Sequence, residues 1–293
     1  MTDADSIHNV LCFGEVLWDR LPDGDVPGGA PMNVAYHLTK LGCTAWLLSS
    51  VGDDRLGKEL MWQLRDWQVR CDYVNVDRVR PTGTVSVAIE NGSPTYDIAN
   101  DVAWDRIVVP GDLAAVAPTA AAVVYGSLAQ RQPYNRSSLL HILEQTPTAL
   151  KVFDVNLRSP YDDHEVIWQL ARRADLIKLN DEEIGVLLNA SYGASELEQR
   201  ARELAGLTEC DRVCITAGAE GAGLLDKGTW HWATSEEVIV ADTIGAGDAF
   251  LAALVAGLVR QSADPGPILA RASHLAGFVA SQKGATPNYN VCE

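Results

Sequence analysis

The chain has little positive charge, with 23 Lys and Arg residues against 39 Asp and Glu residues and a formal net charge of −16 over 293 residues. Binding to nucleic acid or another long polyanion requires a basic stripe, which this sequence lacks. A small phosphorylated ligand is compatible with the charge, because a few backbone N–H groups and single Lys or Arg residues can hold it. The composition therefore excludes nucleic acid as a partner and leaves small anions open.

Paired cysteines and long apolar runs are missing as well. The six cysteines show no paired spacing, and Cys12, Cys43 and Cys214 lie in apolar runs, so we expect reduced, mostly buried thiols in a cytoplasmic protein. Cys210 and Cys214 lack the His or Cys pair that would complete a zinc site. The polar, acidic start MTDADSIHNV is unlike a signal peptide, and no apolar run reaches membrane-spanning length. We therefore expect no membrane partner.

Two phosphate-binding motifs are absent. No run matches the Walker A loop, which needs Gly-Lys-Ser/Thr after four spacer residues. The run 218–223 (GAEGAG) is not the dinucleotide fingerprint, and it follows a late strand instead of the first, which disfavours a dinucleotide-dependent oxidoreductase. The run itself predicts a tight turn, with a backbone nest for phosphate oxygens as the alternative.

What the sequence does contain is a regular alternation of short apolar runs and amphipathic stretches. This pattern predicts a single α/β domain over residues 1–293, with three α/β/α layers and a mainly parallel central sheet. Ligands of such sheets bind in the loops beyond the carboxyl ends of the strands. The expected strands are 10–13, 45–49, 121–125, 150–154, 176–179 and 212–216, and the expected helices are 32–41, 56–67, 133–144, 163–173 and 194–205.

One region interrupts the alternation. Residues 84–89 (TVSVAI) alternate with period two, Asn91-Gly92 is typical of a tight hairpin, and 95–98 are again extended. Together with 16–28, this stretch of about 80–106 predicts a small β lid over the carboxyl edge of the sheet. An ordinary surface hairpin is the alternative. An exposed lid edge is also a surface that a second subunit can cover, which makes a homodimer through the lid a hypothesis.

The most informative stretch is 242–250 (DTIGAGDAF). Ile239-Val240 before it predict the end of a strand, and the apolar run 251–259 after it predicts a helix that begins near Gly245. Small residues at a helix N-terminus leave N–H groups open to an anion, and Asp248 in the first turn would lie beside it. A carboxylate in that place can accept a proton from an attacking hydroxyl. An acidic helix N-terminus that only complements the dipole is the alternative.

A second glycine-rich run, 28–35 (GGAPMNVA), has a similar form. Its glycines allow close backbone approach, Pro31 suits the first helical position, and Asn33 offers an amide in the first turn. A capped helix start explains the same residues. Upstream, the first strand is followed by Glu15 and Asp19, and a carboxylate there can accept hydrogen bonds from sugar hydroxyls or simply serve a turn.

Polar residues also follow two later strands. The segment 153–158 (FDVNLR) places Asp, Asn and Arg in alternation, and a wholly polar face is costly in a core but useful in a site. Asn180 and Glu183 have the spacing of a capping box, which accounts for them fully. The same two side chains could also hold the water shell of a Mg²⁺ ion.

Taken together, these motifs resemble those of the ribokinase-like (pfkB-type) sugar kinases, and most closely the fructokinases among them. Seven motifs occur in the order of that family, nearly from end to end of the chain. They are Gly-Glu-x-x-x-Asp at 14–19, Gly-Gly-Ala-Pro-x-Asn-Val-Ala at 28–35, VGDDRLG at 51–57, Asp-x-Asn-x-Arg at 154–158, Asn-x-x-Glu at 180–183, Thr-x-Gly-x-x-Gly at 216–221 and Asp-Thr-x-Gly-Ala-Gly-Asp-Ala-Phe at 242–250.

The resemblance implies a role for each matching residue. Asp248 would take the proton from the sugar hydroxyl, and the N–H groups of Gly245, Ala246 and Gly247 would form an anion hole. The residues implied for the sugar are Asp19, Gly28, Gly29, Asn33, Asn156, Arg158 and Asp248. Those implied for the nucleotide are Lys178, Asn180, Glu183, Thr216, Gly218, Gly221, Gly247 and His274, with Asn180 and Glu183 holding Mg²⁺ through water. Those implied for a K⁺ ion are the side chains of Asp242 and Asn288 and the backbone oxygens of Ile244, Val279 and Gly284.

The activity implied by the resemblance is transfer of the γ-phosphoryl group of ATP to a sugar hydroxyl, with Mg²⁺ and K⁺ as cofactors. D-fructose, converted to fructose 6-phosphate, is the expected acceptor, and ribose, tagatose and 2-keto-3-deoxygluconate stay open. Lid side chains such as Tyr96, Asp97 and Trp104 would distinguish these acceptors. A catalytically silent sugar-binding regulator is the alternative from another class, and the intact Asp248 argues against it.

Overall fold

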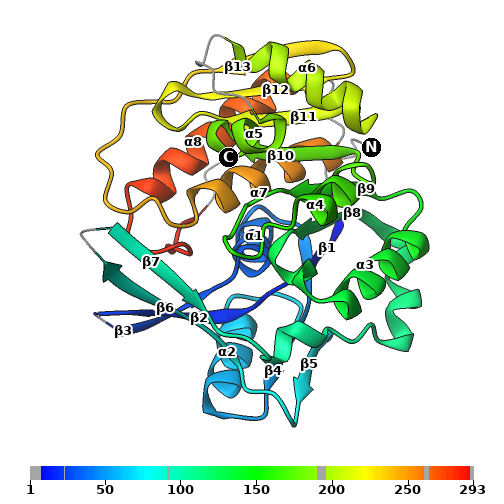
Figure 1. Ribbon diagram of the computed structural model, residues 1–293, viewed down its shortest axis with the longest axis vertical. Coiled ribbons are helices and arrows are strands. Elements are labelled where there is room, and N and C mark those ends of the chain that lie inside the picture. Colours follow the sequence, from blue (N-terminus) through cyan, green and yellow to red (C-terminus); the bar gives the residue numbers. More distant parts are fainter. Residues whose placement is uncertain (1–7, 23, 91–92, 190–195, 261–263, 291–293) are drawn as a thin grey trace.

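The computed structural model describes residues 8–22, 24–90, 93–189, 196–260 and 264–290, apart from the side chains of 87–96. A sheet with the strand order β13-β12-β11-β10-β9-β8-β1-β4-β5 forms its centre (Figure 1). Seven neighbouring strands of this sheet run parallel: β5, β4, β1, β8, β9, β10 and β11. The strand β12 pairs antiparallel with both β11 and β13. The predicted mainly parallel sheet is therefore confirmed. Its strands are β1 (Asn9–Phe13), β4 (Thr44–Gly52), β5 (Val74–Asp77), β8 (Ala120–Gly126), β9 (Leu150–Asp154), β10 (Leu176–Asn180), β11 (Arg212–Thr216), β12 (Ala222–Asp226) and β13 (Thr229–Ala233).

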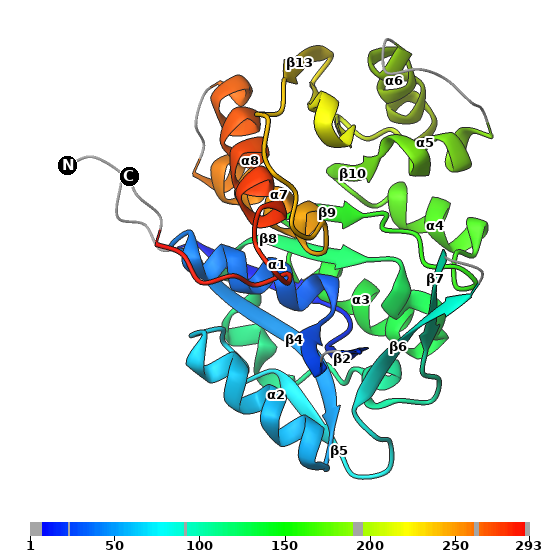
Figure 2. The same ribbon diagram turned by 90° about the vertical axis from the view of Figure 1, so that its left-hand side faces the viewer.

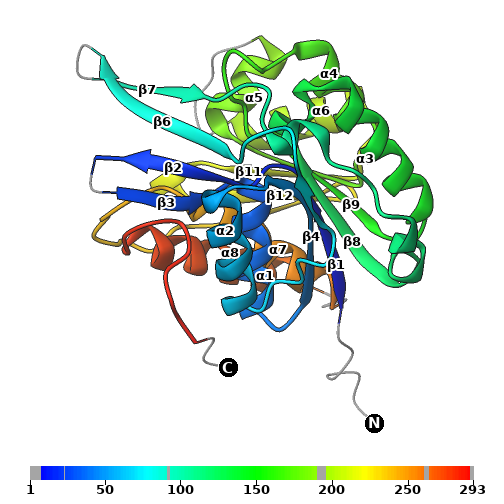
Figure 3. The ribbon, with the colours of Figure 1, turned by 90° about the horizontal axis from the view of Figure 1, so that it is seen from below.

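Helices cover both faces of this sheet, as Figure 3 shows. The central strands are apolar on both sides: Leu11 and Phe13 of β1 pack into one hydrophobic core, and Val10 and Cys12 pack into the other. The first core is closed by α3 (Pro133–Gln145), α4 (His164–Ala171), α5 (Asp181–Leu188) and α6 (Leu197–Thr208), and the second by α1 (Ala30–Lys40), α2 (Arg55–Asp66), α7 (Ala246–Val259) and α8 (Pro265–Ala280).

Several elements differ from what the sequence predicts, and β5 and β13 are strands that were not expected. The helix α8 was not expected, although Asp264 caps its Gly266 N–H and Pro265 occupies its first turn. Ile239 and Val240 do not end a strand, because residues 234–240 lie outside any sheet and the Ile239 side chain is 92% exposed. Hydrophobic character alone suggested that strand, and among the described residues no strand pairs with it.

The predicted small lid sheet is also present. Its strand order is β3-β2-β6-β7, with β2 (Leu17–Leu21) pairing parallel to β6 (Gly83–Glu90). The remaining strands, β3 (Gly24–Gly28) and β7 (Ser93–Ile98), form the two edges of this sheet. Figure 3 shows the lid projecting from the body of the protein.

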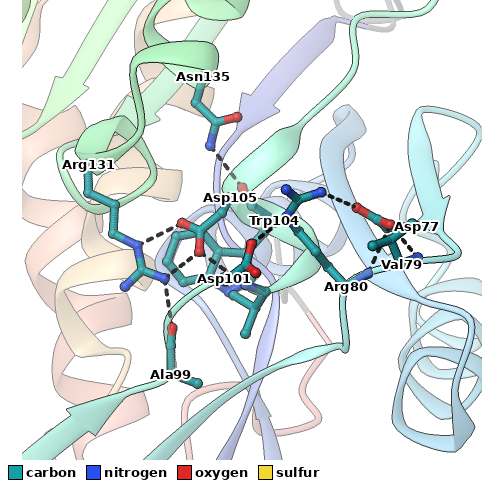
Figure 4. A network of polar contacts seen from close by, with 10 residues as sticks. Asp77, Val79, Arg80, Ala99, Asp101, Trp104, Asp105, Arg131 and Asn135 are labelled. Atoms are coloured by element: carbon teal, nitrogen blue, oxygen red, sulfur yellow. Dashed lines mark hydrogen bonds and ion pairs between the residues drawn. The ribbon is translucent and has the colours of Figure 1, made fainter.

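Two arginines hold the connections between the lid and the body (Figure 4). Arg80, before β6, donates to Asp101, after β7, across 2.7 Å. Arg131 makes two bonds of 2.7 and 2.8 Å to Asp105, and its guanidinium lies 4.1 Å from the centre of the Trp104 ring. Trp104 is fully buried in this anchor, so it does not face the sugar as we expected. The Tyr96 side chain lies outside the described residues.

Candidate active site

Polar side chains gather where β1, β9 and β10 end and α7 begins. Asp248, in the first turn of α7, is only 9% exposed. The Asn33 side-chain amide, in the first turn of α1, donates to Asp248 Oδ2 across 2.8 Å. This bond joins two motifs that are 215 residues apart in the chain.

Asp248 has the protonation behaviour of a general base near neutral pH. Burial raises the pKa of Asp248 to about 7, with a further contribution from the nearby Asp154. The Asn33 hydrogen bond and the charges of Lys178 and Arg158 act in the opposite direction. A base is most effective when its pKa lies near the working pH, so this carboxylate is suited to accept a proton from a hydroxyl.

The turn that precedes α7 requires glycine. Gly245 has φ +79°, in the left-handed region, and a Cβ there would lie 2.5 Å from Ala285 Cα. One of the three expected anion-hole amides is not free: Ala246 N–H donates to Thr243 O (3.3 Å) because residues 243–246 close a turn. This bond argues against a role of the Ala246 N–H in binding an anion. The predicted anion hole is therefore reduced to the N–H groups of Gly245 and Gly247.

A buried lysine lies beside this turn. Lys178 Nζ donates to Asp154 Oδ1 across 3.0 Å, and the two side chains are 7% and 5% exposed. A Cβ on Gly247 would lie 3.3 Å from Lys178 Nζ, so the ammonium adjoins the expected anion hole. Burial works against the charged form, but Asp154, Glu183 and Asp248 outweigh it and raise the pKa of Lys178 to about 12. Lys178 therefore stays protonated next to the place where a phosphate would bind.

The partner of this lysine was missed from the sequence. Asp154 was noted only as one member of a polar alternation, whereas in the structure it faces Lys178 across paired parallel strands. Asp154 Oδ2 has no hydrogen-bond partner among the described residues. Strand order places these two residues opposite each other, and the spacing along the chain does not reveal it.

The loop after β1, the strand β2 and the end of β3 provide the candidate sugar side. A Cβ on Gly28 would collide with the Asp19 carboxylate, so a side chain there would displace Asp19. Burial raises the pKa of Asp19 to about 6, and the charge of Arg158 opposes this shift. Glu15, the other carboxylate that follows the first strand, is buried with Oε2 unpartnered among the described residues, and burial raises its pKa. Asn156 lies on the same loop as Arg158, at φ +40°.

Asn180 and Glu183 form the predicted capping box. Asn180 Oδ1 accepts from Glu183 N (2.7 Å), and Glu183 Oε2 accepts from Asn180 N (2.9 Å). Glu183 Oε1 also accepts from Leu157 N (2.8 Å), so backbone amides contact both carboxylate oxygens. Within the described ranges no group of three or more His, Cys, Asp or Glu could hold a metal. A Mg²⁺ ion here would depend on phosphate oxygens and water, which matches its tendency to keep several waters.

The residues expected around K⁺ are brought together only in part. Asp242 Oδ1 accepts from Ile244 N (3.0 Å) and Oδ2 from Gly284 N (3.1 Å), which closes one loop around this carboxylate. Val279 lies near the C-terminal end of α8, next to Ala280, whose O accepts from Asp242 N (3.1 Å). Asn288 is placed differently, because its Oδ1 accepts from Lys40 on α1 (2.9 Å). That side-chain oxygen is therefore engaged elsewhere.

The remaining residues expected to contact the nucleotide lie at the end of β11, in the turn after it and on α8. Thr216 ends β11, and Gly218 begins the predicted tight turn, which Ala217 N closes with Gly221 O (2.8 Å). Gly221 has φ +135°, and a Cβ there would collide with Ala233 O. His274 is exposed on α8 and contacts Glu236 (3.1 Å).

A buried carboxylate, a glycine turn and a lysine at one helix N-terminus, on a three-layer α/β fold, form an arrangement suited to phosphoryl transfer. The family model of the pfkB family carbohydrate kinases matches residues 24–291, and the chain belongs to this family. Within the described residues, no helix is long and apolar enough to cross a membrane.

Three relatives illustrate the similarity. A fructokinase of Klebsiella pneumoniae is 30% identical over 294 residues, which cover 94% of each chain. The fructokinase of Vibrio cholerae O395, solved with fructose, ADP and calcium, has a TM-score of 0.81 at 26% identity and covers 96% of both chains. The aminoimidazole riboside kinase of Salmonella enterica, solved with aminoimidazole riboside and an ATP analogue, has a TM-score of 0.80 at 25% identity and covers 95% of both.

Proposed function

We propose that this protein is an ATP-dependent fructokinase, which transfers the γ-phosphoryl group of ATP to D-fructose and forms fructose 6-phosphate. The observation that carries the proposal is the buried Asp248, held by Asn33 at 2.8 Å beside the glycine turn of α7. The fructokinases of Klebsiella pneumoniae and Vibrio cholerae support fructose as the acceptor.

In the proposed reaction, the sugar hydroxyl oxygen attacks the γ-phosphorus and its proton passes to Asp248. The bond from the γ-phosphorus to the bridging oxygen breaks, and ADP leaves with that electron pair. The N–H groups of Gly245 and Gly247 and the ammonium of Lys178 stabilise the charge on the transferred group. Asp154 keeps this ammonium in place and balances its charge. Mg²⁺, when bound with the nucleotide, supplies further charge neutralisation, and Asn180 and Glu183 would contact its waters.

The charge of the candidate sugar side favours a neutral acceptor. Glu15, Asp19 and Asp248 are carboxylates at that end, and Arg158 is the cation that acts on all three. A sugar acid would bring another carboxylate into this poorly solvated group, which like-charge repulsion disfavours. We therefore place fructose ahead of 2-keto-3-deoxygluconate. Ribose and tagatose are neutral and stay as alternatives, and the Salmonella enterica kinase makes a riboside the second candidate.

The proposal also includes a role for the lid, a K⁺ site and a location in the cell. Closure of the β2-β3-β6-β7 sheet over the sugar would exclude water as a competing acceptor, and the β7 edge is the surface through which a homodimer would form. The loop around Asp242 is the proposed K⁺ site. Cytoplasmic location stays a prediction, which the free thiols of Cys12, Cys43, Cys71, Cys210 and Cys214 support.

The test is an ADP-release assay with fructose, ribose, tagatose, glucose, 2-keto-3-deoxygluconate and adenosine as acceptors. The proposal predicts the highest kcat/KM with fructose and little ADP release when no sugar is present. A higher kcat/KM with another acceptor would replace fructose. Absence of sugar-dependent ADP release with all of them would overturn the kinase activity itself.

A further inference from the structure

The C-terminal segment, residues 284–290, lies along α1. Figure 2 shows the chain after α8 turning beside α7 and then running across α1. The Tyr36 hydroxyl donates to Pro287 O across 2.6 Å, which fastens the segment to this helix. The same helix presents Asn33 to the catalytic carboxylate one turn earlier.

A fully buried histidine makes the central contact between α1 and this segment. His37 is 0% exposed, with Nε2 2.9 Å from Ala285 O and Nδ1 2.8 Å from the Tyr289 hydroxyl. A carbonyl oxygen can only accept, so Nε2 carries the hydrogen and Nδ1 accepts from Tyr289. Burial lowers the pKa of His37 to about 4, although the Ala285 bond opposes this, so the ring is neutral at physiological pH. A neutral imidazole satisfies both partners at once.

Ala285, which His37 holds, also supports the Gly245 turn. A Cβ on Gly245 would lie 2.5 Å from both Ala285 Cα and Ala285 Cβ, so the two backbones are in direct contact. Asp242 reinforces this contact, because its carboxylate accepts from Ile244 N and from Gly284 N, the residues just before each partner. Movement of Ala285 would therefore displace the turn that carries the proposed anion hole.

We propose that His37 is a positioning residue, which fixes the Gly245 turn relative to the sugar-binding helix through Ala285. Asn33 and His37 are four residues apart and lie on one face of α1, so the helix sets the sugar-side amide and the phosphoryl-side turn at a constant separation. His37 itself touches none of the reacting atoms. The effect on turnover rests on the proposed function, and the link from His37 to the turn does not.

A purely stabilising role for the C-terminal segment is the competing explanation, and Tyr36 provides the matched control. Tyr36→Phe removes a hydrogen bond from the neighbouring residue to the same segment but leaves Ala285 held. His37→Phe keeps a ring of similar size and leaves Ala285 O and the Tyr289 hydroxyl without their partner. His37→Gln restores a donor and an acceptor.

The experiment measures backbone hydrogen exchange in residues 241–250 without substrates, and then kcat and the fructose dissociation constant. We expect His37→Phe to accelerate exchange in that stretch and to lower kcat about tenfold, as a slightly misplaced transition-state group does. The fructose dissociation constant should change less than about twofold, since Asn33 and Asp19 are untouched. His37→Gln should recover most of the loss, and Tyr36→Phe should leave both exchange and kcat close to those of the wild type.

Unchanged exchange in His37→Phe would overturn the proposal, and so would equal effects of His37→Phe and Tyr36→Phe. If His37→Phe does not fold, His37→Leu decides, because it also leaves Ala285 O without its donor. Faster exchange in 241–250 of that variant supports the link, and wild-type exchange refutes it. Because exchange is measured without substrate, a wild-type protein inactive on every sugar would refute the kinase function and leave this result standing.

Discussion

The proposed phosphoryl-transfer end of the molecule and its lid are built in different ways. Lys178 and Asp154 lie on neighbouring parallel strands and Asp248 lies in the first turn of α7, and all three are buried with hydrogen-bond partners within 3.0 Å. The lid is a sheet of four short strands, joined to the body through connections that Arg80 and Arg131 hold. We infer from the comparison that burial keeps the proposed catalytic groups in place, whereas the lid, as a separate sheet, is suited to control access and choice of acceptor.

The largest effect should come from the base. Asp248→Asn keeps the size and shape of the side chain and an oxygen for the Asn33 contact, but an amide cannot accept the proton. We therefore expect kcat to fall by a factor of at least about 10³. Fructose binding, measured by calorimetry without ATP, should change little. Turnover close to that of the wild type would remove Asp248 from its role.

Loss of the lysine should rank next. Lys178→Met removes the charge beside the anion hole and leaves Asp154 buried without its cation, and we expect kcat to fall by a factor of about 10²–10³. Lys178→Arg is the control, since it keeps the charge. Steady-state kinetics with varied ATP would show a loss mainly in kcat. A loss confined to the KM for ATP would mean that Lys178 only binds the ground state.

A smaller effect, of another kind, is expected at the lid. Arg131→Met leaves Asp105 buried without its partner, which lowers the free energy of unfolding by about 3–5 kcal/mol. It also weakens the contact that holds the segment after β7 to the body. We expect the KM for fructose to rise about tenfold with a modest change in kcat. Arg80→Met is the control, because its nearest partner, Asp101, is exposed and such pairs contribute at most about 1 kcal/mol, while its second pair, with Asp77, is longer at 3.4 Å. A kcat loss in Arg131→Met comparable to that of Lys178→Met would end the distinction between the two regions.

The smallest effect concerns stability. Folding raises the pKa of Asp248 to about 7, so the stability contributed by its protonated form is complete below its ordinary pKa and is lost as the pH rises towards 7. Asp248→Asn avoids this loss, and its Tm should exceed that of the wild type at pH 8 but not at pH 4. Thermal unfolding at the two pH values measures the difference. A variant that is less stable at pH 8 would show that the carboxylate is not strained there.

The sequence predicts the secondary-structure elements of this molecule better than the contacts between distant residues. Apolar runs located β1, β9 and β11, because strands buried on both faces have few polar residues, and the glycines at 245 and 247 located the start of α7. The pairing of Asp154 with Lys178 depends on strand order, and the contact of His37 with Ala285 joins residues 248 apart. Such long-range contacts leave no periodic pattern along the chain. Trp104 was misplaced because an aromatic residue near a lid predicts ligand stacking as readily as burial.

The acid limb of kcat/KM for fructose, at saturating MgATP, tests the buried base most directly. With Asp248 as the base, we expect activity to fall as the pH drops through about 7, because Asp248 must be deprotonated to accept the proton. We also expect Asp154→Asn to move this limb to lower pH, since the negative charge of Asp154 contributes to the raised pKa of Asp248. A kcat/KM that stays flat down to pH 5 in the wild type would show that Asp248 is not the base.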